Sequence, residues 1–313
     1  MTTSCLVTGG AGFVGSNLVR ALVARGDRVR VLDNFFSGKR ENLAEVAGAI
    51  ELVEGDVRDE ATLGHALAGV EIVFHEAAIP SVPRSLVDPV ASHEANATAT
   101  LKLLRASREA GVRRVVYAAS SSAYGDTPTL PKVETMRPAP LSPYAVSKLT
   151  GELYCQVFAG AYGLDTVSLR YFNVFGPRQD PGSAYAAVIP RFVTAALAGA
   201  PLTIYGDGSQ SRDFCYVDDA VAANLLAAAA PSAVSGRVFN VAGGAATTLN
   251  DVAHMIGELV GRAVEVSYAP ARTGDVKHSR ADHEAARVGL GYGPAVPFSE
   301  GLRRTIAWYA QPR

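Results

Sequence analysis

The chain has 313 residues, of which 48% are hydrophobic and 19% charged, and its formal net charge is −1. These values describe an ordinary globular protein that is long enough for one large core or two modest domains. Charges of both signs are scattered along the chain, so the sequence has no basic stripe of the kind that binds a phosphate backbone. We therefore do not expect a nucleic-acid partner.

The three cysteines, Cys5, Cys155 and Cys215, are far apart, odd in number and not spaced as metal-binding pairs. This usage predicts reduced thiols in a cytoplasmic protein. The six histidines are scattered, so we expect no metal site. The chain enters a strand-like run without the regions of a signal peptide, and no apolar stretch is long enough for a bilayer, so we expect no membrane association.

Strand-like and helix-like patterns alternate through the first half of the chain. We expect strands near 4–8, 28–32, 51–53, 71–75, 114–118 and 166–170, and helices near 12–25, 96–110 and 144–162, with Gly26 as a helix C-cap. Such alternation predicts an α/β fold in which a doubly wound, Rossmann-type parallel sheet is wrapped by helices. After Asn173, glycines and prolines punctuate shorter segments, which predicts a smaller C-terminal α/β domain over 174–313. The first domain then covers 1–173, and an apolar strand near 237–241 returns to its sheet.

A glycine-rich loop follows the first expected strand and opens the first expected helix. Gly9, Gly12 and Gly15 have the spacing with which such a loop presents backbone N–H groups to a pyrophosphate. Gly9 would allow the tight turn, Gly12 the close approach of the diphosphate, and Gly15 the packing of helix on strand. A glycine-rich turn without a ligand is the alternative.

Acidic residues at the ends of the next two strands fit the same dinucleotide site. Asp33 lies where an acid accepts both ribose hydroxyls, and a carboxylate there repels a 2′-phosphate, so NAD is favoured over NADP. Lys39 and Arg40 lie close enough to leave NADP open. Asp56 and Val57 would flank the adenine, or form an ordinary turn at a strand end.

Tyr144 and Lys148 are one helical turn apart on a single face of an expected helix, which is the geometry of a catalytic base. Ser142 is the expected N-cap and Pro143 the first helical residue, so Tyr144 lies near the positive end of the helix dipole. This end and the lysine both favour phenolate, which predicts a lowered pKa for the tyrosine. A tyrosine and a lysine four residues apart also occur as an ordinary pair on an exposed helix face, which is the alternative interpretation.

Ser120, Ser121 and Ser122 follow a central strand at the edge where α/β sheets bind ligands, and their hydroxyls suit a sugar. Together with the glycine loop and the Tyr–Lys pair, they make the chain resemble an extended short-chain dehydrogenase/reductase of the nucleotide-sugar epimerase branch. The resemblance is closest to the bacterial UDP-N-acetylglucosamine 4-epimerases. It rests on the segments 7–15, 75–78, 81–85, 169–174, 212–214 and 272–275.

The resemblance implies roles for individual residues. It assigns catalysis to Tyr144, Lys148, Ser120 and Ser122. It implies that NAD contacts Gly9, Gly12, Phe13, Val14, Gly15, Asp33, Asn34, Ser37, Gly38, Asp56, Val57, Ala77, Ala78, Asn96, Tyr144, Lys148 and Tyr171. It implies that the UDP-sugar contacts Val82, Arg84, Ser121, Ser122, Tyr144, Asn173, Val188, Arg191, Thr203, Tyr205, Arg212, Arg272, Asp275 and Ser279.

The expected reaction is inversion at the sugar C4. Tyr144 would take the proton of the C4 hydroxyl while C4 passes hydride to NAD, and return of hydride to the other face of the 4-keto sugar inverts the centre. Related dehydratases and decarboxylases typically carry an acid where Ala123 follows Ser122, so epimerisation is favoured. A reductase that releases the ketone and a regulatory NAD sensor with a silent site remain alternatives.

The expected substrates and the expected oligomeric state are implied by the resemblance. The small Ser279 would admit an N-acetyl group at C2, so UDP-GlcNAc/UDP-GalNAc and UDP-Glc/UDP-Gal are expected substrates. Arg191 or Arg84 could instead meet a C6 carboxylate, which makes UDP-glucuronate the second choice. The amphipathic segments 96–110 and 144–162 would pair with a second copy in a four-helix bundle, which predicts a homodimer.

Overall fold

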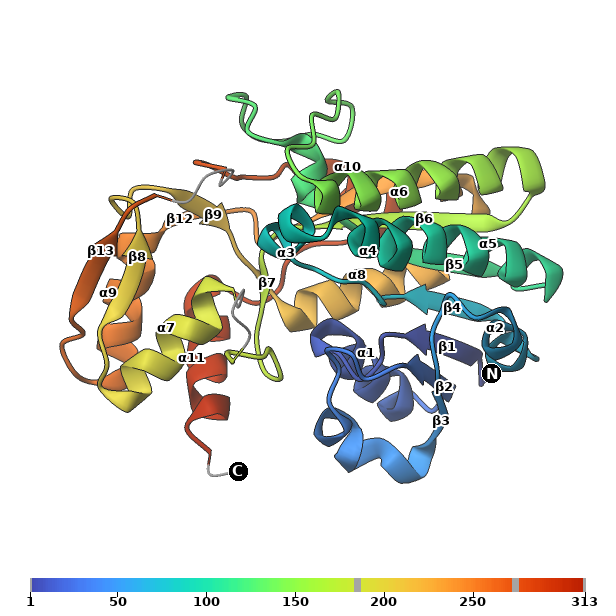
Figure 1. Cartoon of the computed structure of the whole chain (residues 1–313), viewed down its shortest axis with the longest axis horizontal. Coiled ribbons are helices and arrows are strands. Elements are labelled where there is room, and N and C mark those ends of the chain that lie inside the picture. Colours follow the sequence, from blue (N-terminus) through green and yellow to red (C-terminus); the bar gives the residue numbers. More distant parts are fainter. Residues whose placement is uncertain (1, 183–186, 272–275, 312–313) are drawn as a thin grey trace.

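The computed structural model describes residues 2–182, 187–271 and 276–311, and its centre is a parallel β-sheet (Figure 1). Within these residues the sheet has seven strands in the order β11-β6-β5-β4-β1-β2-β3. The strands are β1 (Ser4–Thr8), β2 (Arg28–Asp33), β3 (Ile50–Glu54), β4 (Ile72–His75), β5 (Arg114–Ser120), β6 (Asp165–Tyr171) and β11 (Arg237–Val241). The predicted Rossmann-type α/β fold is confirmed, and the strand predicted near 237–241 lies beside β6.

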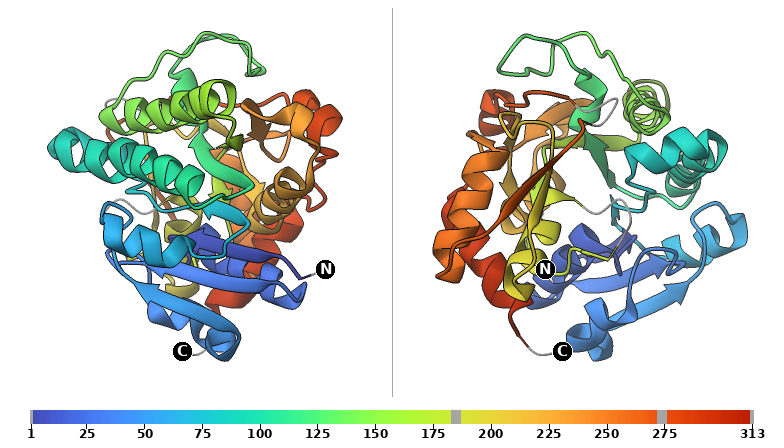
Figure 2. Two further views of the ribbon diagram at one scale, coloured as in Figure 1. Left: turned by 90° about the vertical axis from the view of Figure 1, so that its right-hand side faces the viewer. Right: turned by 60° about the vertical axis from the view of Figure 1, so that its left-hand side comes forward.

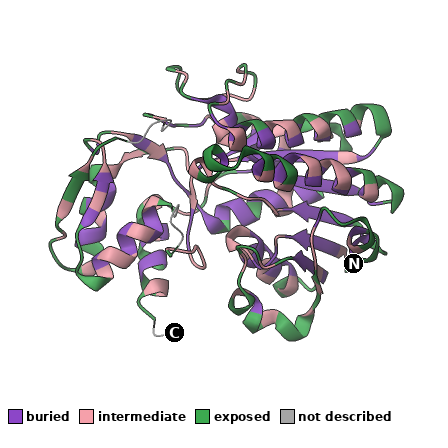
Figure 3. Ribbon diagram, viewed as in Figure 1, coloured by how far each residue is buried: buried purple, intermediate pink, exposed green. Residues whose placement is uncertain are grey.

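Helices cover both faces of this sheet. On one face lie α1 (Phe13–Ala24) and α8 (Val217–Ala229), which contact each other, and on the other lie α2 (Glu60–Leu67), α5 (Ala99–Glu109) and α6 (Pro143–Tyr162) (Figures 1 and 2). Because both faces are covered, the central strands are continuous buried runs and show no alternation (Figure 3).

Helix ends follow the sequence signals in most places. The Ser142 hydroxyl accepts the Ala145 N–H at 3.2 Å, and Pro143 is the first residue of α6, as predicted. The prediction of Gly26 as the C-cap of α1 was wrong by one position, because Arg25 holds helical angles and Gly26 follows it with φ +86°.

The helix predicted over 96–110 is found for most of its length as α5 (Ala99–Glu109), but its first residues belong to a π-helical turn that two short helices precede. The chain forms α3 (Val82–Val87), α4 (Pro89–His93), a π-helical turn (Glu94–Thr98) and then α5. The wide turn contains the buried Asn96, whose amide accepts the Ile79 N–H at 2.8 Å and donates to the Ser147 hydroxyl at 3.0 Å. Asn96 thus ties the loop after β4 to α6, and π-turns of this kind often occur at functional sites.

The C-terminal part forms a second apolar core around short strand pairs (Figure 1). The pairs are β7 (Val174–Phe175) with β10 (Cys215–Tyr216), β8 (Leu202–Tyr205) with β13 (Val266–Ala269), and β9 (Ser211–Asp213) with β12 (Ala246–Thr248). The helices of this core are α7 (Val188–Ala198), α9 (Leu249–Val260) and α11 (Phe298–Tyr309), whereas α10 (Glu284–Leu290) packs against β11 and α8 in the core of the main sheet. Short 3₁₀ segments lie at Arg40–Ala49, Ser121–Tyr124 and Ser232–Val234.

A buried ion pair fixes α6 to the sheet. The guanidinium of Arg170 on β6 donates two hydrogen bonds to the carboxylate of Glu152 on α6, at 2.6 and 2.8 Å. Both side chains are at most 3% exposed. A bidentate pair allows one orientation only, so it sets the position of α6 along β6.

We expect Glu152→Ala to lower the free energy of unfolding by about 3–5 kcal/mol, because the charge of Arg170 would stay buried without its partner. The double substitution Glu152→Ala with Arg170→Met removes that charge as well and should be less damaging than Glu152→Ala alone. Urea denaturation followed by circular dichroism measures both. A double variant at least as unstable as Glu152→Ala would contradict this account.

Candidate active site

A cavity of about 830 Å³ runs along the carboxyl ends of the central strands. It lies where the strand order reverses between β4 and β1, which is the usual ligand site of an open α/β sheet. Most of the predicted site residues line it: Gly9, Gly12, Phe13, Val14, Gly15, Asp33, Asn34, Ser37, Gly38, Asp56, Val57, Ala77, Ala78, Val82, Arg84, Ser120, Ser121, Ser122, Tyr144, Lys148, Tyr171, Asn173, Arg212 and Ser279.

The structure does not bring every predicted residue to the cavity wall. Asn96 is buried behind the wall, where it holds the loop after β4. Val188, Arg191, Thr203 and Tyr205 are not among the lining residues, and the guanidinium of Arg191 stacks over the ring of Tyr205 at 5.5 Å. Arg272 and Asp275 lie outside the described residues. Direct ligand contacts of these residues stay predictions.

The glycine loop leaves room for a backbone-bound diphosphate. A Cβ on Gly9, which has φ +67°, would lie 2.7 Å from Cα of Ala77. A Cβ on Gly15 would lie 2.2 Å from the carbonyl oxygen of Gly9, so Gly15 brings α1 against the loop itself, where packing on the strand had been predicted. A Cβ on Gly12 would have one neighbouring atom, the carbonyl oxygen of Gly9 at 3.1 Å, and Gly12 lines the cavity. No side chain caps α1, so its first N–H groups can bind an anion.

Asp33 lies at the adenosine end expected for this fold. Its carboxylate accepts the N–H groups of Ala11 at 2.9 Å and Phe35 at 2.8 Å, and burial raises its pKa although these bonds oppose the shift. The two cations that had left NADP open both pair with acids: Lys39 with Asp180 at 3.1 Å, and Arg40 with Glu54.

Asp56, which follows β3, also lines this end of the cavity. Hydrogen bonds from Arg58 lower the pKa of Asp56 to about 2, so this carboxylate is ionised at neutral pH. Its second partner is the amide of Asn34 at 2.9 Å, which joins the ends of β2 and β3. The two predicted residues therefore form one hydrogen-bonded polar wall at this end of the cavity.

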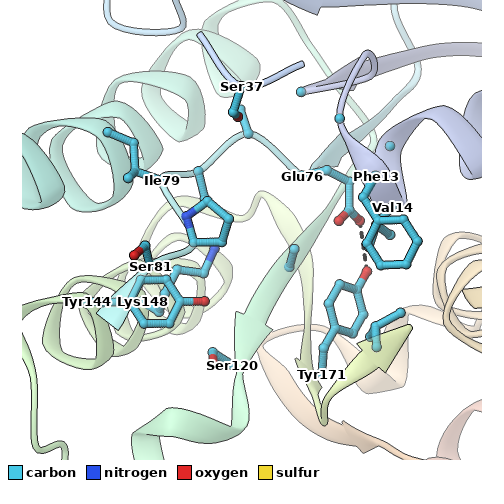
Figure 4. A pocket seen from close by; sticks show the side chains of 18 of the residues that line it. Phe13, Val14, Ser37, Glu76, Ile79, Ser81, Ser120, Tyr144, Lys148 and Tyr171 are labelled. Carbon is cyan, nitrogen blue, oxygen red and sulfur yellow. Dashed lines mark hydrogen bonds between the residues drawn. The ribbon is translucent and has the colours of Figure 1, made fainter. Parts of the chain in front are cut away.

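Tyr144 and Lys148 point into the other end of the cavity side by side (Figure 4). Lys148 lies over the ring of Tyr117 at 4.5 Å, and burial lowers its pKa to about 8 although the charge of Glu76 opposes the shift. Burial also raises the pKa of the Tyr144 phenol, and a hydrogen bond with Ser120 only partly offsets this. The predicted lowering of the Tyr144 pKa was therefore wrong for the protein alone, because desolvation outweighs the other effects.

The serine run forms a short hydrogen-bond chain beside the phenol. The Ser122 hydroxyl donates to the Ser120 oxygen at 2.8 Å, and the Ser122 N–H donates to the same oxygen at 3.2 Å. Ser120 in turn hydrogen-bonds with Tyr144. Because the oxygen of Ser120 accepts both bonds from Ser122, its own proton is available to the phenol oxygen, and a hydrogen bond donated there favours phenolate.

Sequence reasoning missed several residues of the cavity wall. Glu76 accepts a hydrogen bond from the Tyr171 hydroxyl at 2.8 Å (Figure 4). Phe36 also lines the wall, and the guanidinium of the predicted Arg84 lies over its ring at 4.4 Å. Tyr124 and Lys132 line the end of the cavity near Ser122. Glu76 directly follows β4 at the ligand edge, which was a signal for it, whereas the Arg84–Phe36 contact joins distant segments and left no local pattern.

The described residues contain no cluster of three or more histidine, cysteine or acidic side chains that could bind a metal ion. Among them there is also no helix with both the length and the hydrophobicity of a membrane span. The described cysteines are buried, and burial raises the pKa of Cys5 and Cys155 to about 12.

Comparisons with known proteins agree with this geometry. Residues 5–242 match the model of the NAD dependent epimerase/dehydratase family. A UDP-glucose 4-epimerase of Mycolicibacterium smegmatis is 42% identical over 97% of each chain. A UDP-N-acetylglucosamine 4-epimerase of Methanobrevibacter ruminantium, solved with UDP-N-acetylmuramic acid, has a TM-score of 0.94 and 41% identity over 99% of each chain.

A UDP-glucose 4-epimerase of Thermus thermophilus, solved in complex with NAD, has a TM-score of 0.90 and 39% identity, covering 98% of this chain and 99% of its own. These findings confirm the resemblance to nucleotide-sugar epimerases that the sequence motifs indicated. The open approach to Gly12 and the uncapped start of α1 fit the cofactor's diphosphate. The chain belongs to the NAD-dependent epimerase/dehydratase family, and NAD is its cofactor.

Proposed function

We propose that the protein inverts C4 of UDP-hexoses, with UDP-GlcNAc/UDP-GalNAc and UDP-Glc/UDP-Gal as its substrates. The observation that carries this proposal is the convergence of Tyr144, Lys148 and Ser120 on one end of the cavity (Figure 4). The similarity of the chain to a UDP-glucose 4-epimerase and a UDP-N-acetylglucosamine 4-epimerase supports it. Residues 1–173 with β11 would bind NAD, and residues 174–313 would bind the nucleotide sugar.

The residues have separate tasks in this proposal. Tyr144 removes the proton of the C4 hydroxyl and later returns it, and the Ser122–Ser120 chain supports the phenolate through its hydrogen bonds. Lys148 contributes a positive charge that favours phenolate and binds the ribose beside it. Bound NAD would supply the acceptor for the C4 hydride and give it back, so the reaction has no net oxidation.

The fate of the ketone depends on which proton donors are near. Ala123 follows Ser122 and is buried, so the acid that related dehydratases and decarboxylases place there is missing. That position then lacks the usual proton-transfer group for the loss of water at C5 and C6. Epimerisation is therefore preferred over those reactions. Intact Tyr144 and Lys148 also argue against a non-catalytic NAD sensor.

Ser279 supports acceptance of N-acetylated sugars. It lines the cavity, and within the described residues its buried hydroxyl has no hydrogen-bond partner. A small side chain leaves room for the acetamido group, and the unpaired hydroxyl can bond to it. For UDP-glucuronate, the second choice, Arg84 would have to leave its contact with Phe36.

A homodimer is part of the proposal. Val146, Leu153 and Val157 follow one stripe of α6 and are 46%, 49% and 51% exposed. Three large apolar side chains at helical spacing on the surface favour burial against a second copy. The adjacent α5 would complete a four-helix bundle across a two-fold axis.

Purified protein should invert C4 of UDP-GlcNAc and UDP-Glc when NMR resolves the products of a panel that includes UDP-GalNAc, UDP-Gal and UDP-glucuronate. Ser279→Tyr should reduce turnover of the N-acetylated pair by about tenfold or more and spare the plain hexoses, because the larger ring fills the space at C2. Inversion of none of these sugars, or release of a 4-keto product, would refute the epimerase assignment.

Tyr144→Phe should lower kcat by about 10²- to 10⁴-fold, because the base is lost while the ring still fills its place. Bound NAD, measured by absorbance after denaturation, should remain. Wild-type turnover in this variant would exclude Tyr144 as the base, and loss of NAD would show that the substitution damages the cofactor site.

Leu153→Glu should convert the dimer to a monomer in sedimentation velocity, because two buried carboxylates would face each other across the axis. The matched control is Val288→Glu, which adds the same charge at a residue that is 71% exposed on α10. The bundle proposal fails if the wild type sediments as a monomer or if both variants remain dimers.

A further inference from the structure

Glu76 is a carboxylate in the wall of the cavity to which neither the proposed proton transfer nor the diphosphate site assigns a task. It directly follows β4, between the glycine loop and the end of β5, and it lines the same cavity as Tyr144 and Lys148 (Figure 4). His75, the residue before it, points elsewhere: its ring bonds to the hydroxyls of Thr8 at 2.7 Å and Thr100 at 2.9 Å.

Hydrogen bonds fix Glu76 as an acceptor. The amide nitrogen of Asn224 on α8 donates to the carbonyl of Ala220 at 3.0 Å and to the hydroxyl oxygen of Tyr171 at 2.6 Å. Because Tyr171 accepts this bond, its own proton is available for the carboxylate of Glu76 at 2.8 Å. Acceptance of a hydrogen bond favours the ionised carboxylate.

The surroundings of Glu76 make its charge effective. Burial raises its pKa to about 7, while Tyr171, the charge of Lys148 and Asn224 oppose this shift. Within the described residues, Lys148 is the cation whose charge acts on Glu76 in this way, and Glu76 acts reciprocally on Lys148. A second cation in the cavity would favour ionisation further.

We propose that Glu76 biases the cofactor site toward the oxidised dinucleotide. The nicotinamide ring carries a positive charge in NAD+ and none in NADH, so a carboxylate that hydrogen bonds fix in the cavity wall distinguishes the two by charge alone. This inference rests on the proposed function, because it places the nicotinamide end beside Tyr144 and Lys148. An enzyme that returns its sugar without net oxidation must begin each cycle with NAD+.

The test is the partition of the two dinucleotides in the absence of sugar. Wild-type protein and variants are equilibrated with defined NAD+/NADH mixtures until the bound ratio is constant, and the bound dinucleotides are separated by chromatography after denaturation. Glu76→Gln, which keeps the shape and removes the charge, should shift the bound ratio toward NADH by about tenfold. Glu76→Asp, which keeps the charge, should stay close to wild type.

Two further variants control the result. Asp180→Asn removes one negative charge from the same cavity, at a residue that is 40% exposed and paired with Lys39, and should leave the ratio unchanged. Glu76→Leu replaces the carboxylate with an apolar side chain of similar size, so it serves if Glu76→Gln does not fold. It should give the same shift.

An unchanged ratio in Glu76→Gln or Glu76→Leu, or an equal weakening of both dinucleotides, would overturn the proposal and leave Glu76 as an anchor for Tyr171. The same shift in Asp180→Asn would also overturn it, because the effect would then be one of net charge. The partition test contains no sugar, so it can fail while the sugar panel succeeds. The sugar panel can equally fail while the partition test succeeds, and the two proposals are therefore judged separately.

Discussion

The bidentate pair between Glu152 and Arg170 is the interaction on which the geometry of the site depends. Glu152 lies one helical turn after Lys148 on α6, and Arg170 directly precedes Tyr171 on β6. Arg170 also lies over the ring of Tyr124, whose hydroxyl donates to Asn240 at 2.7 Å. One buried charge pair thus sets the distance between the tyrosine base, the cofactor wall and the strand that returns from the C-terminal half.

Two features of the structure act in opposite directions on the ionisation of Tyr144. Its place in the first turn of α6 and its neighbour Lys148 favour phenolate, but burial of the ring favours the neutral phenol. The Ser122–Ser120 chain adds hydrogen-bond support without adding charge. A phenol of this kind ionises most readily when positive charge is close, so a cationic ligand in the cavity would favour the phenolate that accepts the proton.

Much of the fold could be predicted because its signals are local. The strand runs, the Ser142–Pro143 start of α6 and the glycine spacing each depend on neighbouring residues, and they lie within a few residues of the observed elements. The break at Glu94–Thr98 was missed because a π-turn depends on Asn96 reaching Ile79 and Ser147, which are distant in sequence. The pKa of Tyr144 was misjudged for the same reason, since burial is a property of the whole fold. The Arg84–Phe36 contact likewise joins segments that are distant in sequence.

Arg114 lies at the opposite edge of the sheet from the cavity. It starts β5, pairs with Asp165 at 2.5 Å on the neighbouring strand, and donates to the carbonyls of Ala227 and Ala230 where α8 ends. The amino edge of the sheet is therefore clamped by its own ionic and helix-capping bonds, independent of any ligand. Substitutions in the loops at the carboxyl edge can consequently change which sugar is recognised while the bonds of Arg114 keep the sheet and α8 in place. Substrate preference can therefore change in evolution without loss of the stability that the amino edge provides.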